Sequence, residues 1–231
     1  MDERTWQRIG AWAGIGFFVL SVLATFLYPQ PPRPDSDPAV VLRWAHTHRA
    51  GLEAGMALGI VAAMSLVWFV AHLRHLLARA GAEALSSVVY GSGMALVAVF
   101  ALGAAPVATL VFMDGQPGGV NDGAVVRLLI DLNQILFSPA AGLAAVLLLA
   151  AGIAMLSTKV LPPAVGWAAI VVAALDAIEV VTSLTFSSYH AGLWTVIGWG
   201  GYLGLLVMIP LIGIAGLRRP EPAPALAAVT S

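Results

Sequence analysis

Six long apolar stretches, each bounded by charges or prolines, dominate this sequence. A bilayer core about 30 Å thick is crossed by roughly 20 helical residues at 1.5 Å each. Runs of that length or longer occupy residues 9–28, 51–72, 85–113, 124–156, 163–186 and 192–217. The pattern predicts an all-α, polytopic membrane helix bundle with about six transmembrane helices.

The composition agrees with lipid, rather than water, as the solvent of this chain. Hydrophobic residues make up 60% of the sequence and charged residues only 10%, with a mean hydropathy of +0.91. A soluble domain would need roughly a quarter of its residues charged to cover its surface. The chain has no cysteine, which excludes disulfides, iron–sulfur clusters and a thiol nucleophile, and its net charge of −1 indicates no nucleic-acid partner.

We expect one transmembrane domain over residues 1–217, followed by a short disordered tail over residues 218–231. The first run is too long for a typical secretory signal and lacks a clear cleavage site, so we interpret it as an uncleaved span. The fourth run exceeds one bilayer crossing. Its Ser138-Pro139 pair predicts a bend there, because proline removes a backbone hydrogen bond from a helix.

Basic residues near the span ends predict the orientation, because they accumulate on the cytoplasmic side. An N-terminus in the cytoplasm places seven basic residues inside and four outside, which favours cytoplasmic termini at both ends of the chain. The inside set is Arg4, Arg8, Arg74, Arg79, Lys159, Arg218 and Arg219, and the outside set is Arg33, Arg43, Arg49 and Arg127. We therefore expect a multi-pass protein of the cell membrane, with the lipid bilayer as its partner. An arginine-rich, Ala- and Gly-rich composition suggests a bacterial source.

The loop after the first span predicts an additional short helix. Asp37 can cap it, Pro38 suits its first position, and the apolar residues that follow predict that it leads straight into the second span. Glycines four residues apart, as at Gly10 and Gly14 or at Gly200 and Gly204, predict places where helices approach closely. Such spacing is common wherever membrane helices pack, so it leaves the oligomeric state open.

Two polar stripes mark the most unusual part of the sequence, because each ionisable group inside a span costs about 2.5–3.5 kcal/mol on insertion. The fourth span carries Arg127, Asp131, Gln134 and Ser138 along one helical face, and the fifth carries Asp176, Glu179, Ser183 and Ser187. Glu53 lies at the outer mouth of the second span. We predict that Glu53, Arg127, Asp131, Gln134, Asp176 and Glu179 line an outward-facing polar pocket.

The chemistry of that pocket depends on its carboxyl groups. Two neighbouring carboxylates in a low dielectric cannot both ionise cheaply, so we expect Asp176 or Glu179 to hold a proton near neutral pH. Alternatively, the polar groups only hydrogen-bond one another and fix the helix register.

We expect no metal and no cofactor. The spans show no paired midplane histidines for a haem, and the sequence has no Gly-Lys-Ser/Thr loop for ATP. His46, His190 and a carboxylate could supply zinc ligands, but nothing fixes the required spacing.

Four segments carry a resemblance to a known class of proteins. They are RWAHTHRAGLEAG (residues 43–55), VWFVAHLRHLL (67–77), DLNQILF (131–137) and LPPAVGWAAI (161–170). With them the chain resembles six-span membrane proteins of actinobacteria and other GC-rich bacteria that are grouped as domains of unknown function. The resemblance covers nearly the whole chain. It implies the fold and the membrane location, and it assigns no functional residue.

Three functions remain open at this stage. The first is proton-linked or small-solute binding and transport through the polar pocket, with a small solute, a proton or a lipid as ligand. The second is a membrane-embedded enzyme that acts on a lipid or isoprenoid and uses a protonated carboxylic acid as its general acid. The third is a structural or regulatory subunit without catalytic activity.

Overall fold

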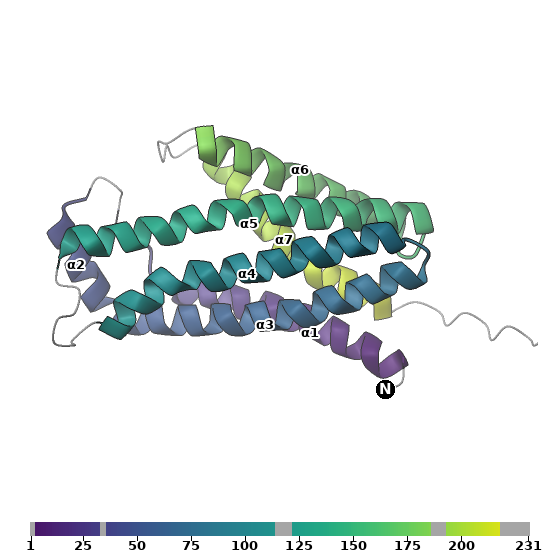
Figure 1. Ribbon diagram of the computed structural model, residues 1–231, viewed down its shortest axis with the longest axis horizontal. Coiled ribbons are helices and arrows are strands. Elements are labelled where there is room, and N and C mark those ends of the chain that lie inside the picture. The colour runs from purple at the N-terminus through teal and green to yellow at the C-terminus, as the bar shows by residue number, and fades with distance from the viewer. Residues whose placement is uncertain (1–2, 33–35, 114–121, 186–192, 218–231) are drawn as a thin grey trace, which may run out of the picture.

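The computed structural model of the chain is a bundle of long antiparallel helices (Figure 1). It describes residues 3–32, 36–113, 122–185 and 193–217. For some residues within these ranges, Gln134 among them, it describes only the backbone. The helices are α1 (Glu3–Leu27), α2 (Pro38–Thr47), α3 (Arg49–Arg79), α4 (Glu83–Met113), α5 (Gly123–Thr158), α6 (Pro163–Thr185) and α7 (Leu193–Leu217).

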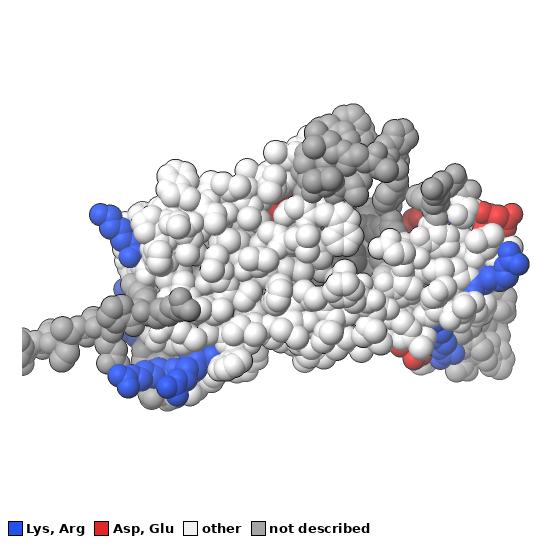
Figure 2. Space-filling view, turned by 180° about the vertical axis from the view of Figure 1, so that it is seen from behind, with Lys and Arg blue, Asp and Glu red and all other residues white. Residues whose placement is uncertain are grey.

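Six of these helices are long and apolar enough to cross a membrane, as the sequence predicts. Lys and Arg side chains gather at the two ends of the molecule and leave a broad band without them in between (Figure 2). This band of exposed apolar side chains is the surface that contacts the lipid bilayer. The chain is therefore a multi-pass membrane protein.

The six spanning helices form a closed ring in chain order. Each of them packs against its neighbours along the chain, and α1 packs against α7 to close the ring, while α3, α5 and α7 also touch one another. The main core lies where these three helices meet, with Phe69, Leu147, Ala151 and Ile209 almost completely buried. Because the helices alternate in direction, the start of α1 and the end of α7 lie on the same side of the bundle as the turns at residues 80–82 and 159–162. We call this side the turn end (Figure 1).

Glycines allow the helices of the ring to approach closely. The ring of His72 lies directly on the backbone of Gly10, and a side chain at Gly14 would meet Phe69 and the carbonyl oxygen of Ile209. Between α5 and α6, Gly152 lies against the carbonyl oxygen of Gly166. Lipid tails are as apolar as the side chains, so such shape-matched contacts, rather than release from water, hold membrane helices together.

The helices α3, α4 and α5 extend well past the end of α6. Gly142 of α5 lies opposite Val180 of α6, and from there α5 continues 19 residues to Gly123, roughly 28 Å of helix. From the same level α6 has only five residues left, roughly 8 Å. We call the structure formed by α2 and the adjoining ends of α3, α4 and α5 the cap (Figure 1).

The cap has its own small hydrophobic core. Val41 of α2, Leu110 of α4 and Val126 and Ile130 of α5 are buried together in it. Asp37 caps α2 by accepting a hydrogen bond from the backbone N–H of Ala39, at 2.7 Å, so the predicted cap and the predicted proline at the first position are confirmed.

The sequence led to two predictions about helix continuity, one at the start of α3 and one at Pro139. The prediction that α2 leads straight into the second span is wrong, because α2 ends at Thr47 and α3 begins at Arg49. His48 separates them with a non-helical backbone, and its ring nitrogen Nδ1 lies 2.9 Å from the carbonyl oxygen of Trp44. The helix α5 runs through Pro139 without interruption, and a bend at this proline stays a prediction.

Candidate functional site

Asp176 and Glu179 form a pair of carboxyl groups on the side of α6 that faces α7. They are three positions apart in the sequence, so they lie on one face of the helix. Asp176 is almost completely buried, with 2% of its surface exposed, and Glu179 is partly exposed. The buried position of Asp176 makes this pair the most unusual polar feature among the spanning helices.

Gly201 of α7 gives the two carboxyl groups their space. A Cβ atom added at Gly201 would overlap Oδ1 of Asp176 and lie 3.1 Å from Oε2 of Glu179. Both oxygens therefore face the same point on the α7 backbone. One turn further along α7, a Cβ at Gly204 would come within 2.7 Å of the side chain of Val172. The helices α6 and α7 can cross this closely only because both positions are glycine.

The sequence predicted the wrong glycine for this contact. Spacing alone paired Gly200 with Gly204, but a Cβ at Gly200 would meet nothing closer than Leu175 at 3.9 Å. Gly201 and Gly204 are three residues apart and share the face toward α6, as the helical period allows. With adjacent glycines at 200 and 201, only the rotation of α7 decides which one makes the contact.

Asp176 has an oxygen, Oδ2, that is buried and has no hydrogen-bond partner among the described residues. A polar atom in this state is costly, because it has lost its water without gaining a replacement. The described residues of α6 and α7 contain no Lys, Arg or His that could neutralise an Asp176 carboxylate. A bound proton would remove most of the cost, since a neutral acid tolerates burial far better than an anion.

Tyr202, next to Gly201, ties α7 to α1. Its hydroxyl lies 3.0 Å from Oγ1 of Thr25. Thr25 already donates its single proton to the carbonyl oxygen of Ser21 at 2.9 Å, so Tyr202 is the donor in the bond between α1 and α7. This bond closes the ring of helices beside the carboxyl pair and holds α7 in its position.

The other predicted pocket residues lie elsewhere. Nη1 of Arg127 donates a hydrogen bond to the carbonyl oxygen of Ser36 at 2.9 Å, and its Nε lies 3.6 Å from Oδ2 of Asp131. Glu53 pairs with Arg49 at 3.0 Å, and both side chains are exposed. These ion pairs lie in the cap, where α5 and α3 extend past α6.

The structure does not bring the described side chains of this set together. Asp131 lies 11 residues from Gly142 toward the cap, while Asp176 lies four residues from Val180 in the opposite direction, so the two are separated by roughly 20 Å along the helices. The side chain of Gln134 lies outside the described residues, as do those of Ser138, Ser183, Ser187 and His190. The geometry therefore retains Asp176 and Glu179 as the candidate site.

Asn133 is a buried polar residue that sequence reasoning missed. Its Nδ2 donates a hydrogen bond to the carbonyl oxygen of Gly103 on α4. The bond lies close to Pro106, which interrupts the backbone hydrogen bonding of α4. An amide beside a proline-containing helix is a recognisable signal, but Asn133 lies off the face of the polar stripe that drew attention to α5.

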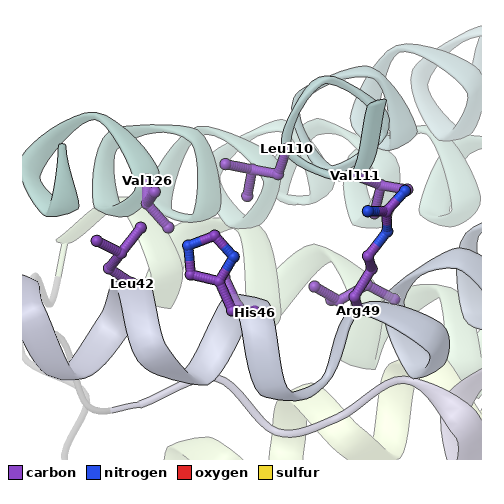
Figure 3. Close-up of a pocket in the computed structure, with 8 residues that line it drawn as sticks. Leu42, His46, Arg49, Leu110, Val111 and Val126 are labelled. Atoms are coloured by element: carbon purple, nitrogen blue, oxygen red, sulfur yellow. The ribbon is translucent and has the colours of Figure 1, made fainter. Parts of the chain in front are cut away.

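A small cavity lies in the cap between α2 and the ends of α4 and α5 (Figure 3). His46 and Arg49 point into it among apolar side chains, including Leu110 and Val126. Its volume of about 20 Å³ has room for about one water molecule. None of the six predicted pocket residues lines it. A second, more open hollow surrounds the α3–α4 turn and also lies away from the carboxyl pair.

Comparison of the chain with protein-family models, with curated proteins and with solved structures gave no match. No family or homologue is therefore identified. The six spanning helices are the part of the resemblance described above that the structure shows.

Replacing Gly201 by alanine tests whether the carboxyl pair rests on α7. Because the new methyl group would occupy the position of Asp176 Oδ1, we expect Gly201→Ala to destabilise the protein by about 1–3 kcal/mol, as overpacking does. The measurement is unfolding in detergent micelles or bicelles. Gly200→Ala is the matched control, since its methyl group would make only an ordinary van der Waals contact with Leu175 at 3.9 Å, and we expect its stability to be unchanged or slightly higher. Equal effects of the two variants would contradict the described contact.

Proposed function

We propose that the protein is a proton-linked membrane binding or transport protein, in which Asp176 and Glu179 hold the proton. One observation carries the proposal. Asp176 is 2% exposed and has a buried oxygen without a hydrogen-bond partner among the described residues, and it shares its face of α6 with a second carboxyl group. An ionised carboxylate inside a span costs about 2.5–3.5 kcal/mol, and a neutral acid avoids this cost.

The closeness of the two groups favours a shared proton. Their oxygens face the same point at Gly201, and two negative charges held together in a low dielectric repel strongly. Binding one proton leaves a single negative charge on the pair and removes this repulsion. In this state the pair can release or take up a proton as its surroundings change.

A lipid-modifying enzyme is the alternative function. Such an enzyme would need an apolar hollow beside its acid to hold the substrate chain. The two hollows described above are lined by cap residues and by the α3–α4 turn, and neither touches Asp176 or Glu179. We assign Glu53, Arg127 and Asp131 to the cap, where each of their ion pairs lies within one helix.

Labelling with N,N′-dicyclohexylcarbodiimide tests the proposal. This apolar reagent adds to protonated carboxylic acids, so its adduct reports a neutral acid within the membrane. We expect mass spectrometry of the protein in proteoliposomes to show the adduct on Asp176 or Glu179 at neutral pH, and less of it as the pH rises. Asp176→Asn should remove the adduct from position 176.

Asp131→Asn is the matched control, because it removes a carboxyl group of the cap and should leave labelling at α6 unchanged. The proposal fails if neither Asp176 nor Glu179 is labelled at any pH at which the protein remains folded. Loss of folding is monitored separately by size-exclusion chromatography of each variant.

We also infer that the turn end faces the cytoplasm of a bacterial cell. The described basic residues outnumber the acidic ones at this end, and the relation is reversed in the cap. The turn end has Arg4, Arg8, Arg74, Arg79 and Lys159 with Glu3 and Glu83, and the cap has Arg43, Arg49 and Arg127 with Asp37, Glu53, Asp122 and Asp131.

Single cysteines test this orientation directly, because the chain has none of its own. In intact cells a membrane-impermeant maleimide should label Arg43→Cys in the cap and leave Glu83→Cys at the turn end unlabelled until the cells are opened. Both positions are exposed in the structure. The opposite labelling pattern would reverse the orientation.

A further inference from the structure

The two carboxyl groups differ in how deeply they are buried and in their distance from the end of α6. Asp176 is buried at the crossing of α6 and α7, whereas Glu179 is partly exposed. Glu179 also lies almost one turn nearer Thr185, the end of α6 that points toward the cap. A proton that arrives from the cap side along this face of α6 therefore meets Glu179 before Asp176.

The geometry points to Glu179 as the group through which protons reach Asp176. This inference rests on the proposed function, and it gives the two acids different roles: Asp176 stores the proton, and Glu179 passes it between Asp176 and water. Oε2 of Glu179 and Oδ1 of Asp176 face the same point on α7, which places them within the reach of one bridging water molecule.

The transfer needs no other reactant. A proton from water binds Oε2 of Glu179 and then moves to Asp176, which leaves Glu179 ionised and ready to accept the next proton. No bond other than O–H forms or breaks, and no electron is exchanged. The reverse sequence returns the proton to water.

Among the described side chains, few other groups can serve as the relay. The neighbouring elements are α5 and α7. From Gly142 to its end, α5 has no ionisable side chain, and the described side chains of α7 contribute only Tyr202. Tyr202 donates its proton to Thr25 on α1, which directs its O–H toward α1 rather than α6. Tyr202 is therefore the competing relay that the experiment must exclude.

Hydrogen–deuterium exchange followed by infrared spectroscopy tests the inference. A protonated carboxylic acid has a carbonyl stretch that an ionised carboxylate lacks, and this band shifts when deuterium replaces the proton. The protein is reconstituted in vesicles of neutral phospholipid and transferred to D₂O. Subtracting the spectrum of Asp176→Asn isolates the band of Asp176. Each variant is measured at a pH at which this band has its full intensity.

We expect Glu179→Gln to slow the shift of the Asp176 band by on the order of 100-fold, the usual contribution of a positioned acid–base group. Glu179→Asp, which keeps a carboxyl group, should restore much of the rate. Tyr202→Phe should leave the rate unchanged.

Exchange in Glu179→Gln as fast as in the original protein would overturn the relay, and so would slow exchange in Tyr202→Phe with normal exchange in Glu179→Gln. These results differ from a failure of the proposed function itself. In that case the original protein would show no Asp176 band at any pH at which it remains folded.

Discussion

The close crossing of α6 and α7 is the contact on which the rest of this account depends. In a bilayer, apolar side chains gain nothing by leaving one apolar surface for another, so helices associate where their surfaces fit. At Gly201 and Gly204 the fit is close enough to bury the carboxyl group of Asp176 against a backbone. Burial of an ionised carboxyl group is costly, which is why the proposed function assigns a proton to it.

Polar groups have two different uses in this molecule. In the cap, charges are paired and partly exposed, as in the contacts of Arg127 with Asp131 and of Arg49 with Glu53. Each pair lies within one helix, four residues apart, and such partly exposed pairs contribute little to stability on their own. Within the bundle, Asp176 has a buried oxygen without a partner among the described residues. An unsatisfied polar atom in this position indicates function more strongly than a satisfied ion pair does.

The architecture could be predicted from the sequence because long apolar runs and helix caps are local signals. The six spans and the Asp37 cap of α2 follow from residue types at known spacings. The predicted pocket could not be predicted in the same way. Periodicity places residues on a face of one helix, but it does not show how far the next helix is shifted along the bundle axis. Asp131 and Asp176 lie on predicted polar faces, yet α5 extends far past α6 and separates them. The choice of Gly201 over Gly200 depends on helix rotation in the same way.

The most direct test of the central claim is the protonation state of Asp176 in a bilayer. Solid-state NMR of protein labelled with carbon-13 at the aspartate carboxyl groups reports it, with the signal assigned by its loss in Asp176→Asn. The account predicts that at neutral pH the Asp176 signal has the chemical shift of a protonated or proton-sharing acid, distinct from the exposed aspartates of the cap. A signal at the position of an ordinary ionised carboxylate, unchanged from neutral to mildly acidic pH, would contradict it.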